Sequence, residues 1–354
     1  MTKDDFLNQL SLHLKNIPQH DYNEIMEHFT EYFDEAGPNK EAQICQELGE
    51  PADVAEEIIN TLDIKKIQPE KDWTDWDDDE PIPATWIEQK FSSITSLNFQ
   101  LYTLNLDIFT DDIAQPTLSY YSDVDNITVN QNGGRLDIIE NKLAQENSMI
   151  FSNLFVGRLL EKRQTITLIL PKNVQLSSII GDSKNGDVSL NEVTCDSSVL
   201  ISYNGNIEVS CLKNAHAKIK SKNGNIKLTN CKFIQSELEN KNANLNCFEC
   251  QLSNCQIVNK NGNIRTIQGS IQETQLENKN GNIIIEHTEL TAKIDVENKN
   301  GFIDITLTDD NLSHCQVKAQ NNNGFVTISK QAGKALPTQV NLSLTNKNGM
   351  ISLH

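Results

Sequence analysis

The stretch SKNGNIKLTNC, residues 221–231, places an Asn-Gly pair between two short runs in which apolar and polar residues alternate. Close variants recur through the second half of the chain as ENKNANLNC, VNKNGNIRT, ENKNGNIII, ENKNGFIDI and TNKNGMISL. The positions equivalent to Gly224 are Gly186, Gly205, Ala243, Gly262, Gly281, Gly301, Gly324 and Gly349. Their spacing is 19 residues five times in succession and then 20, 23 and 25. A nearly fixed period of this length indicates a repeat architecture.

Apolar residues keep fixed places within each unit. Two residues after the glycine position stand Val188, Ile207, Ile226, Leu245, Ile264, Ile283, Ile303, Val326 and Ile351. Their alternation with polar residues is typical of strands with one buried face. One unit holds too few apolar residues to fold alone, so stacking must bury them as continuous stripes. We therefore predict a right-handed parallel β-solenoid, with two strands and two corners in each unit of about 19 residues.

An antiparallel meander of hairpins is the alternative, because Asn-Gly is also the strongest hairpin signal. The solenoid interpretation gives the asparagine before each glycine a structural role. Asparagine and glycine together turn the chain sharply, and stacked asparagines can hydrogen-bond along a ladder. The predicted corner ladder includes Asn204, Asn223, Asn261, Asn280 and Asn300.

The first 62 residues have helical periodicity and predict four short amphipathic helices, which we assign to a domain of residues 1–65. The segments TKDDFLNQLSLHLKNIP, EIMEHFTEYFDEA and ICQELGEPADVAEEI resemble the HAAS domain, a small helical module of bacterial signalling proteins. In that family the module commonly precedes membrane-spanning helices and is linked with PadR-type regulators. The resemblance thus implies a PadR-type regulator or a membrane stress component as the protein partner.

The rest of the chain divides into three parts by composition. Residues 66–87 predict an acidic linker with tryptophans and prolines, residues 88–180 an irregular β-rich beginning of the solenoid, and residues 181–354 the regular repeat. The order of TITLILPKNVQL, GDSKNGDVSL and the NGNI series resembles the bacterial "putative adhesin" family of β-solenoids. The whole fold class is therefore a multidomain α+β chain, with a small all-α domain followed by an all-β solenoid.

Charge and hydropathy exclude several classes of function. The net charge is −19, and residues 1–90 hold 23 acidic and 7 basic side chains. Neither residues 1–90 nor residues 91–354 have the excess of basic side chains that a nucleic-acid binder needs. No apolar run is long enough to span a bilayer, and the charged N-terminus is unlike a signal peptide. We expect a cytoplasmic protein with reduced cysteines, and leave peripheral membrane contact and unconventional export to the surface open.

Catalytic and metal chemistry find no support in the sequence. Glu239, Glu277 and Glu297 recur at one place in successive units, as solvated strand residues do, and do not form an acid pair. Cys247 and Cys250 form a CxxC motif, and Cys255 follows closely. A zinc site would still need a fourth ligand and usually a second such pair. We predict no enzyme activity, no metal and no cofactor.

Two columns, each made of residues at the same place in successive units, are candidate interaction surfaces. The first is a lysine column two residues before the glycine position, which would face an anionic polymer or a lipid surface and includes Lys222, Lys241, Lys260, Lys279, Lys299 and Lys347. The second is an apolar patch of Phe302, Phe325 and Met350, at a place where earlier units have polar residues. The chain ends within a strand, so the C-terminal unit is a candidate for association with a second copy or a partner. Alternatively, residues 330–340 fold over that end.

These observations predict a non-catalytic binding or scaffold protein in bacterial envelope-stress or regulatory signalling. It would combine a rigid β-solenoid with an acidic helical docking module. Two alternatives remain at this point: an adhesin-like surface binder and a carbohydrate-active β-helix enzyme.

Overall fold

The computed structural model describes residues 2–15, 17, 19–37, 40–61, 85–122, 127–141, 164–214 and 216–354. They divide into two compact units, one of which contains the helices of the N-terminal domain and the other most of the strands. The predicted linker lies outside the described residues except for its last three positions. These belong to strand β1 (Thr85–Lys90), where Trp86 packs edge-on against Tyr121 at a centroid distance of 4.9 Å.

Four helices form the N-terminal domain: α1 (Lys3–Leu14), α2 (Gln19–Ala36), α3 (Glu41–Leu48) and α4 (Pro51–Thr61). Thr2 and Asp5 form a capping box that satisfies backbone donors at the start of α1. The core is a ring cluster in which Phe6 lies 6.0 Å from Phe29 and 5.6 Å from Phe33. The helical periodicity thus buries one apolar face of each helix, as predicted.

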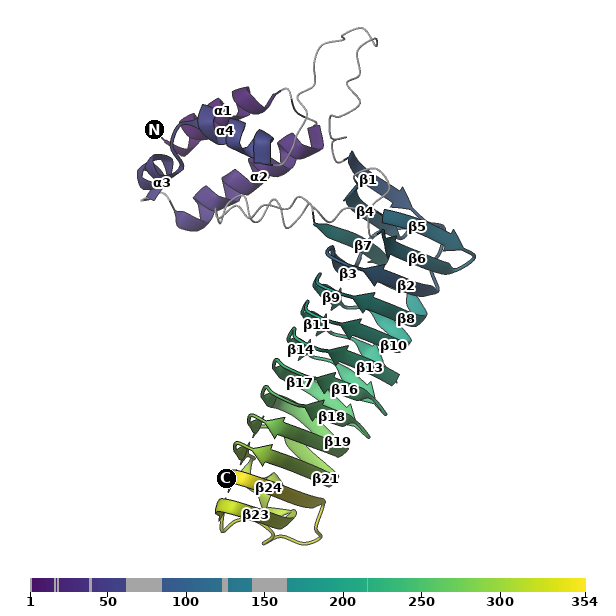
Figure 1. Cartoon of the computed structure of the whole chain (residues 1–354), viewed down its shortest axis with the longest axis vertical. Coiled ribbons are helices and arrows are strands. Elements are labelled where there is room, and N and C mark those ends of the chain that lie inside the picture. The colour runs from purple at the N-terminus through teal and green to yellow at the C-terminus, as the bar shows by residue number, and fades with distance from the viewer. Residues whose placement is uncertain are drawn as a thin grey trace. The chain divides into compact units, whose positions relative to one another are not determined.

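The other unit is built almost entirely of strands (Figure 1). The irregular first part contains β2 (Ser96–Leu101), β3 (Asn105–Asp111), β4 (Thr117–Ser122), β5 (Ile127–Asn132), β6 (Arg135–Glu140), β7 (Thr165–Pro171) and β8 (Gln175–Ser183). Two of its pairings are antiparallel, β4 with β7 and β5 with β6. Strand β2 pairs in parallel with β6 on one side and β8 on the other. Strand β8 in turn pairs in parallel with residues 194–202 and so joins this part to the repeat.

The repeat part contains the remaining strands. They are β9 (Val188–Asn191), β10 (Thr194–Ser202), β11 (Ile207–Ser210), β12 (Lys213–Asn214), β13 (His216–Ser221), β14 (Ile226–Thr229), β15 (Lys232–Ile234), β16 (Glu237–Asn240), β17 (Leu245–Ser253), β18 (Gln256–Asn259), β19 (Ile264–Asn280), β20 (Ile283–Glu286), β21 (Glu289–Asn300), β22 (Ile303–Thr306), β23 (Cys315–Ile328) and β24 (Val340–Leu353). All pairings among them are parallel within the described residues.

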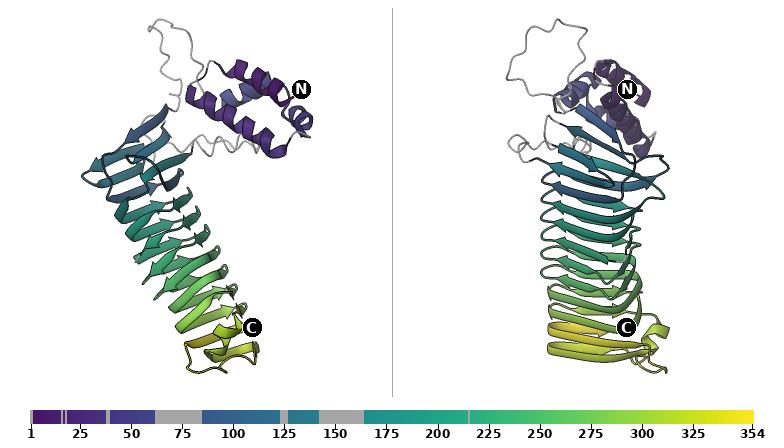
Figure 2. Two further views of the ribbon diagram at one scale, coloured as in Figure 1. Left: turned by 180° about the vertical axis from the view of Figure 1, so that it is seen from behind. Right: turned by 90° about the vertical axis from the view of Figure 1, so that its right-hand side faces the viewer.

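Equivalent residues of successive repeat units lie side by side (Figure 2). Ile207 pairs with Ile226, and Ile226 with Leu245, in each case 19 residues further along the chain. We call one such unit a coil and the glycine position its first corner. Since every pairing between these strands is parallel, the hairpin meander is excluded for the repeat.

Each coil has three sides, whereas the sequence predicted two strands and two corners. In the coil that begins at Gly224 the sides are β14, β15 and β16. The second corner has a positive φ at Glu192, Cys211, Asn230, Glu249, Gln268 and His287, and the third at Gln235, Asn254, Glu273 and Ala292. The prediction missed these corners because left-handed backbone is occupied here by polar residues, cysteine and alanine, without the glycine that usually marks it.

The first-corner glycines are required chiefly for space. A Cβ built on Gly224 would lie 2.0 Å from the carbonyl oxygen of Gly205, and one built on Gly205 as close to that of Gly186. Positive φ occurs only in the later coils, for example at Gly281 with 134°. At the corners that hold glycine, successive coils therefore approach each other more closely than a Cβ atom permits.

Gly224→Ala is expected to lower the free energy of unfolding by about 1–3 kcal/mol, because added atoms in a packed site force the backbone to shift. Ala243→Gly is the matched control at the equivalent corner, where a Cβ is already accommodated, and should change stability by less than about 1 kcal/mol. Thermal melting followed by far-UV circular dichroism compares the two. Equal melting of Gly224→Ala and the wild type would contradict a steric role for this glycine.

The last two layers do not follow chain order, which corrects the sequential stacking predicted from the repeat. Strand β24 pairs with β21 and β22 on one side and with β23 on the other. Gly349 accordingly lies over Gly301, and Gly324 lies over Gly349. The outermost strand is therefore β23, and the C-terminal strand is an inner one.

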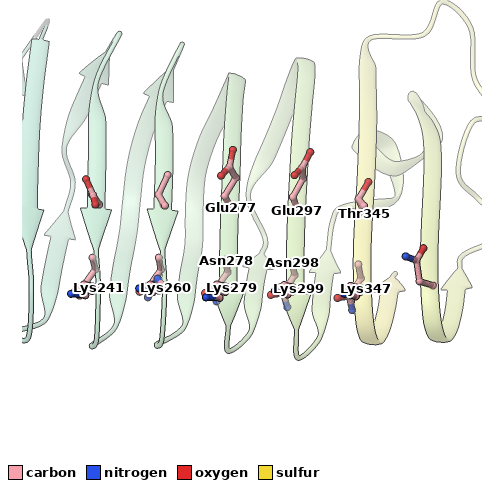
Figure 3. Close-up of a pocket in the computed structure, with 16 residues that line it drawn as sticks. Lys241, Lys260, Glu277, Asn278, Lys279, Glu297, Asn298, Lys299, Thr345 and Lys347 are labelled. Atoms are coloured by element: carbon pink, nitrogen blue, oxygen red, sulfur yellow. The ribbon is translucent and has the colours of Figure 1, made fainter.

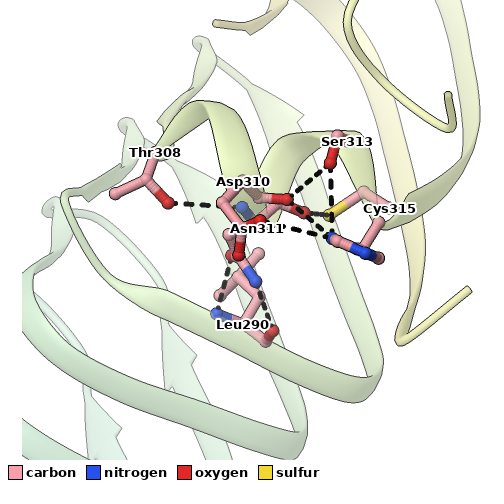
Figure 4. Close-up of polar contacts among 7 residues, drawn as sticks. Leu290, Thr308, Asp310, Asn311, Ser313 and Cys315 are labelled. Carbon is pink, nitrogen blue, oxygen red and sulfur yellow. Dashed lines mark hydrogen bonds and ion pairs between the residues drawn. The ribbon is translucent and has the colours of Figure 1, made fainter. Parts of the chain in front are cut away.

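A short helix stands between β22 and the two exchanged strands in the chain. Helix α6 (Asp309–Ser313) replaces a strand on the second side of its coil (Figure 4). Asn311 donates from Nδ2 to the Leu290 carbonyl at 2.8 Å and accepts from the Leu290 N–H at 3.0 Å, as a paired strand residue would. After α6 the chain runs through the outer layer as β23 and returns over residues 329–339 to fill the layer beneath with β24.

Candidate binding surface

The corner asparagines form a continuous hydrogen-bonded ladder. Asn223 donates from Nδ2 to Asn204 Oδ1 at 2.7 Å, and Asn204 donates in the same way to Asn185 at 2.6 Å. The ladder continues with bonds of 2.7–2.9 Å through Asn242, Asn261, Asn280, Asn300, Asn348 and Asn323. These side chains satisfy one another, so they hold the corners in register and leave no reactive group.

A second ladder follows the residue after each first-corner glycine. Asn225 accepts the backbone N–H of Asn244 at 3.1 Å and donates its own N–H to Asn206 Oδ1 at 2.9 Å. The series ends where Phe302 donates its N–H to Asn282 Oδ1 at 3.1 Å, because phenylalanine offers no acceptor to the next coil. The apolar patch thus begins where this ladder stops.

The apolar patch lies on the last three layers in the order Phe302, Met350 and Phe325. Register pairs Phe325 with Met350, and Phe302 is adjacent to Met350 because Ile303 pairs with Ile351. Phe302 is half-buried, whereas Met350 is 43% and Phe325 80% exposed. Exposure therefore rises toward the outermost strand.

Buried amides form a third column inside the coils. Each Nδ2 donates to two backbone carbonyls, one of its own corner and one of the preceding coil; Asn298, for example, donates to Gly281 at 2.9 Å and to Phe302 at 3.3 Å. The column consists of Asn240, Asn259, Asn278, Asn298, Asn346 and Asn321, and serines take the place of asparagine in the earlier coils. These amides donate hydrogen bonds to corner carbonyl groups that would otherwise have no partner.

Five lysines of the predicted column line one groove of about 650 Å³ (Figure 3). They are Lys241, Lys260, Lys279, Lys299 and Lys347. The sixth, Lys222, does not line the groove; its Nζ lies 5.1 Å from the centre of the Tyr203 ring. Within the described part of the chain no ion pair joins the five groove lysines to an acid. Neighbouring ammonium groups stand on strands about 4.8 Å apart, well within the screening length of about 8 Å in physiological salt.

Glutamates two residues earlier face the same groove, but they are fewer than the lysines. Glu239, Glu277 and Glu297 line it, while Val258 and Thr345 occupy the equivalent places in other coils. Glu239 is already paired with Lys220 of the preceding coil, and Glu277 accepts a hydrogen bond from Gln275 at 2.6 Å. The groove therefore keeps a positive excess of two charges by count of its lining residues.

The cysteines are buried thiols, apart from a half-buried Cys211, and all eight are free. Burial raises the pKa of Cys195 to about 12 and that of Cys315 to about 11. The hydrogen bond to Cys250, together with burial, raises the pKa of Cys231 far above its usual range. Such thiols stay protonated near neutral pH. The described residues contain no cluster of histidine, cysteine or acidic side chains able to hold a metal ion.

One buried carboxylate escaped the sequence analysis. Glu140 of β6 is 7% exposed and accepts the backbone N–H groups of Tyr102, Thr103 and Leu104 at 2.7–3.1 Å. This loop lies against the first corner of the repeat, because Asn185 donates its N–H to the Tyr102 carbonyl at 2.8 Å. A single glutamate at the end of a predicted strand carries no sequence signal of this role.

Comparison with known proteins identifies both parts of the chain. Residues 94–352 match the Toastrack DUF4097 family and residues 5–57 match HAAS. The first match spans more than half of the chain, so the protein belongs to the Toastrack DUF4097 family. Both resemblances inferred from the sequence are thereby confirmed. No curated protein matches the chain.

Three solved structures are similar over about three quarters of the chain. A "putative adhesin" from Parabacteroides merdae is 8% identical, with a TM-score of 0.45 over 77% of this chain and 96% of that one. A "putative lipid binding protein" from Parabacteroides distasonis is 14% identical, with a TM-score of 0.41 over 77% and 97%. A "putative adhesin" from Bacteroides fragilis is 16% identical, with a TM-score of 0.37 over 76% and 97%. Among the described helices none has the length and apolar character needed to cross a membrane.

Proposed function

We propose that this protein is a non-catalytic binding scaffold in which a rigid parallel β-solenoid with a repeat of about 19 residues presents the lysine groove to an anionic polymer. The observation that carries the proposal is the set of five groove lysines without an acidic partner in the described structure. Like charges held this close repel one another, and a ligand with repeated negative charge relieves that repulsion. The strand ladders fix the lysines in a row, so the ligand meets a prearranged surface.

The HAAS module supplies the second half of the proposed function. Its family association with PadR-type regulators supports a role in docking such a regulator, or a membrane stress component, in bacterial envelope-stress or regulatory signalling. We place the protein in the cytoplasm, with peripheral membrane contact and display as an adhesin-like surface binder as alternatives. Catalysis is the least supported function, because the groove carboxylates are single members of a column or are already paired.

The groove is tested with inorganic polyphosphate of defined length as the probe. The triple variant Lys260→Ser, Lys279→Ser and Lys299→Ser is expected to bind about 100-fold more weakly, at about 1 kcal/mol for each lysine near an anionic surface. Raising the salt concentration should weaken wild-type binding and have less effect on the variant. Isothermal titration calorimetry measures both.

The matched control removes three lysines that are already paired. Lys218, Lys227 and Lys293 are joined to Glu237, Glu208 and Asp295, so their replacement by serine should leave polyphosphate binding nearly unchanged. Equal losses in the two triple variants would show that only net charge matters and would contradict a groove-specific site. Vesicles of phosphatidylglycerol, used in place of polyphosphate, distinguish a polymer from a lipid surface.

A further inference from the structure

The outermost strand β23 leaves the interior of the stack open. Val326 and Ile328 occupy the same inward columns as Ile351 and Leu353, which are 0% exposed in the layer beneath. In β23 the exposed fractions rise to 42% and 38%. Two positions that are core in every inner coil are therefore solvent-exposed in this one.

The backbone of β23 has a free edge as well. The strand runs over 14 residues and, within the described part of the chain, pairs only with β24. Its outer N–H and C=O groups can accept another strand, and proteins usually protect such edges with charges, prolines or bulges. Residues 319–328, AQNNNGFVTI, contain no charged side chain and no proline. These ten residues of the edge are therefore neutral and carry none of the usual protection.

The sequence of the edge is complementary to itself under a twofold rotation. The inward residues before the step from Asn322 to Asn323 are Val317, Ala319 and Asn321, and those after it are Gly324, Val326 and Ile328. If two copies meet at this end with the twofold axis through that step, the half before it lies antiparallel to the half after it. One register then places Val317 opposite Ile328 and Ala319 opposite Val326 of the second copy.

The same register avoids conflict between charges. It places Lys318 opposite Thr327 of the second copy, so no lysine in the strand faces another lysine. It also places Asn321, whose buried Oδ1 has no hydrogen-bond partner among the described residues, opposite Gly324 of the second copy. A shift by one residue would set inward side chains against outward ones, so the register is specified by the pleat.

From this self-complementarity we infer that two copies of the chain associate end to end through their β23 strands and form an isologous antiparallel dimer. The interface continues the sheets of both stacks and buries Val326 and Ile328. It assigns the association predicted for the C-terminal unit to β23, because β24 is an inner layer with partners on both sides. The inference is independent of the lysine groove.

Sedimentation equilibrium of the full chain tests the association. We expect the wild type at roughly 100 µM to have twice the 39.8 kDa mass of the chain. The double variant Val326→Glu, Ile328→Glu should be monomeric with an unchanged far-UV spectrum, because both side chains are already exposed in one copy. A monomeric wild type at that concentration overturns the inference, and so does a double variant that stays dimeric.

A cross-linking experiment tests the register without relying on a destabilising change. Residue 322 lies opposite residue 323 of the second copy, beside the twofold axis, so Asn322→Cys should form a covalent dimer under mild oxidation. Gln251→Cys, exposed on a middle coil, is the control and should give no more dimer than the wild type with its eight native thiols. Equal cross-linking of the two variants overturns the inference, even if the protein dimerises by another surface.

Discussion

Glu140→Ala is expected to lower the free energy of unfolding of the strand unit by about 3–5 kcal/mol, because three backbone N–H donors would lose their acceptor, at about 1–3 kcal/mol for each donor left unsatisfied. The side chain is 7% exposed and holds three consecutive backbone N–H groups of the loop 102–104. Alanine would leave these donors without a partner, and the loop would lose its fixed shape. Since this loop lies against the first corner of the repeat, the damage should extend to β8 and β9.

Two variants show whether the loss comes from the hydrogen bonds. Glu140→Gln keeps the shape of the side chain and one acceptor oxygen, so it should lower the free energy of unfolding less than the alanine variant does. Glu208→Ala removes an exposed glutamate paired with Lys227 on a middle coil and should cost at most about 1 kcal/mol. Chemical denaturation followed by circular dichroism gives all three values. A Glu140→Ala protein as stable as Glu208→Ala would show that the loop holds its shape without the carboxylate.

Asn298→Asp is expected to destabilise the stack by about 3–5 kcal/mol at neutral pH, because a buried charge without a partner is costly. The amide Nδ2 of Asn298 donates to the carbonyls of Gly281 and Phe302, and the residue is 5% exposed. A carboxylate has the same shape but offers only acceptors to these two carbonyls. The change therefore replaces two hydrogen bonds with repulsion and leaves the volume unchanged.

The sign of the pH dependence distinguishes this mechanism from a packing defect. Burial next to carbonyl oxygens raises the pKa of the introduced carboxyl in the folded state above its value in the unfolded chain. Its neutral form is thus favoured by folding, and the variant should regain stability relative to the wild type as the pH falls through that raised value. Asn223→Asp, in the exposed ladder, is the control and should cost about 1 kcal/mol or less. A pH-independent loss in Asn298→Asp would contradict the mechanism.

The sequence predicted the features that recur in every coil. Ile207, Ile226 and Leu245 lie at equal spacing, and a side chain repeated at equal spacing needs the same environment each time, which stacking provides. The corner ladder through Asn204 and Asn223 and the lysine column follow from the same argument. The number of sides did not follow, because the residue type at the second corner changes from coil to coil, for example Cys211, Asn230 and Glu249, so no constant residue marks its positive φ.

The sequence by itself determined that residues of successive units lie over one another and that each unit turns at an Asn-Gly corner, or at Asn-Ala in the unit of Ala243. Periodicity encodes local pairing, and each unit repeats it. Only the tertiary structure decided that β24 enters between β22 and β23, that Glu140 organises the loop at the other end, and that β23 is left open. These features depend on which segment fills a layer. Distant segments compete for the same strand edge, and the repeated residues do not indicate which segment will occupy it.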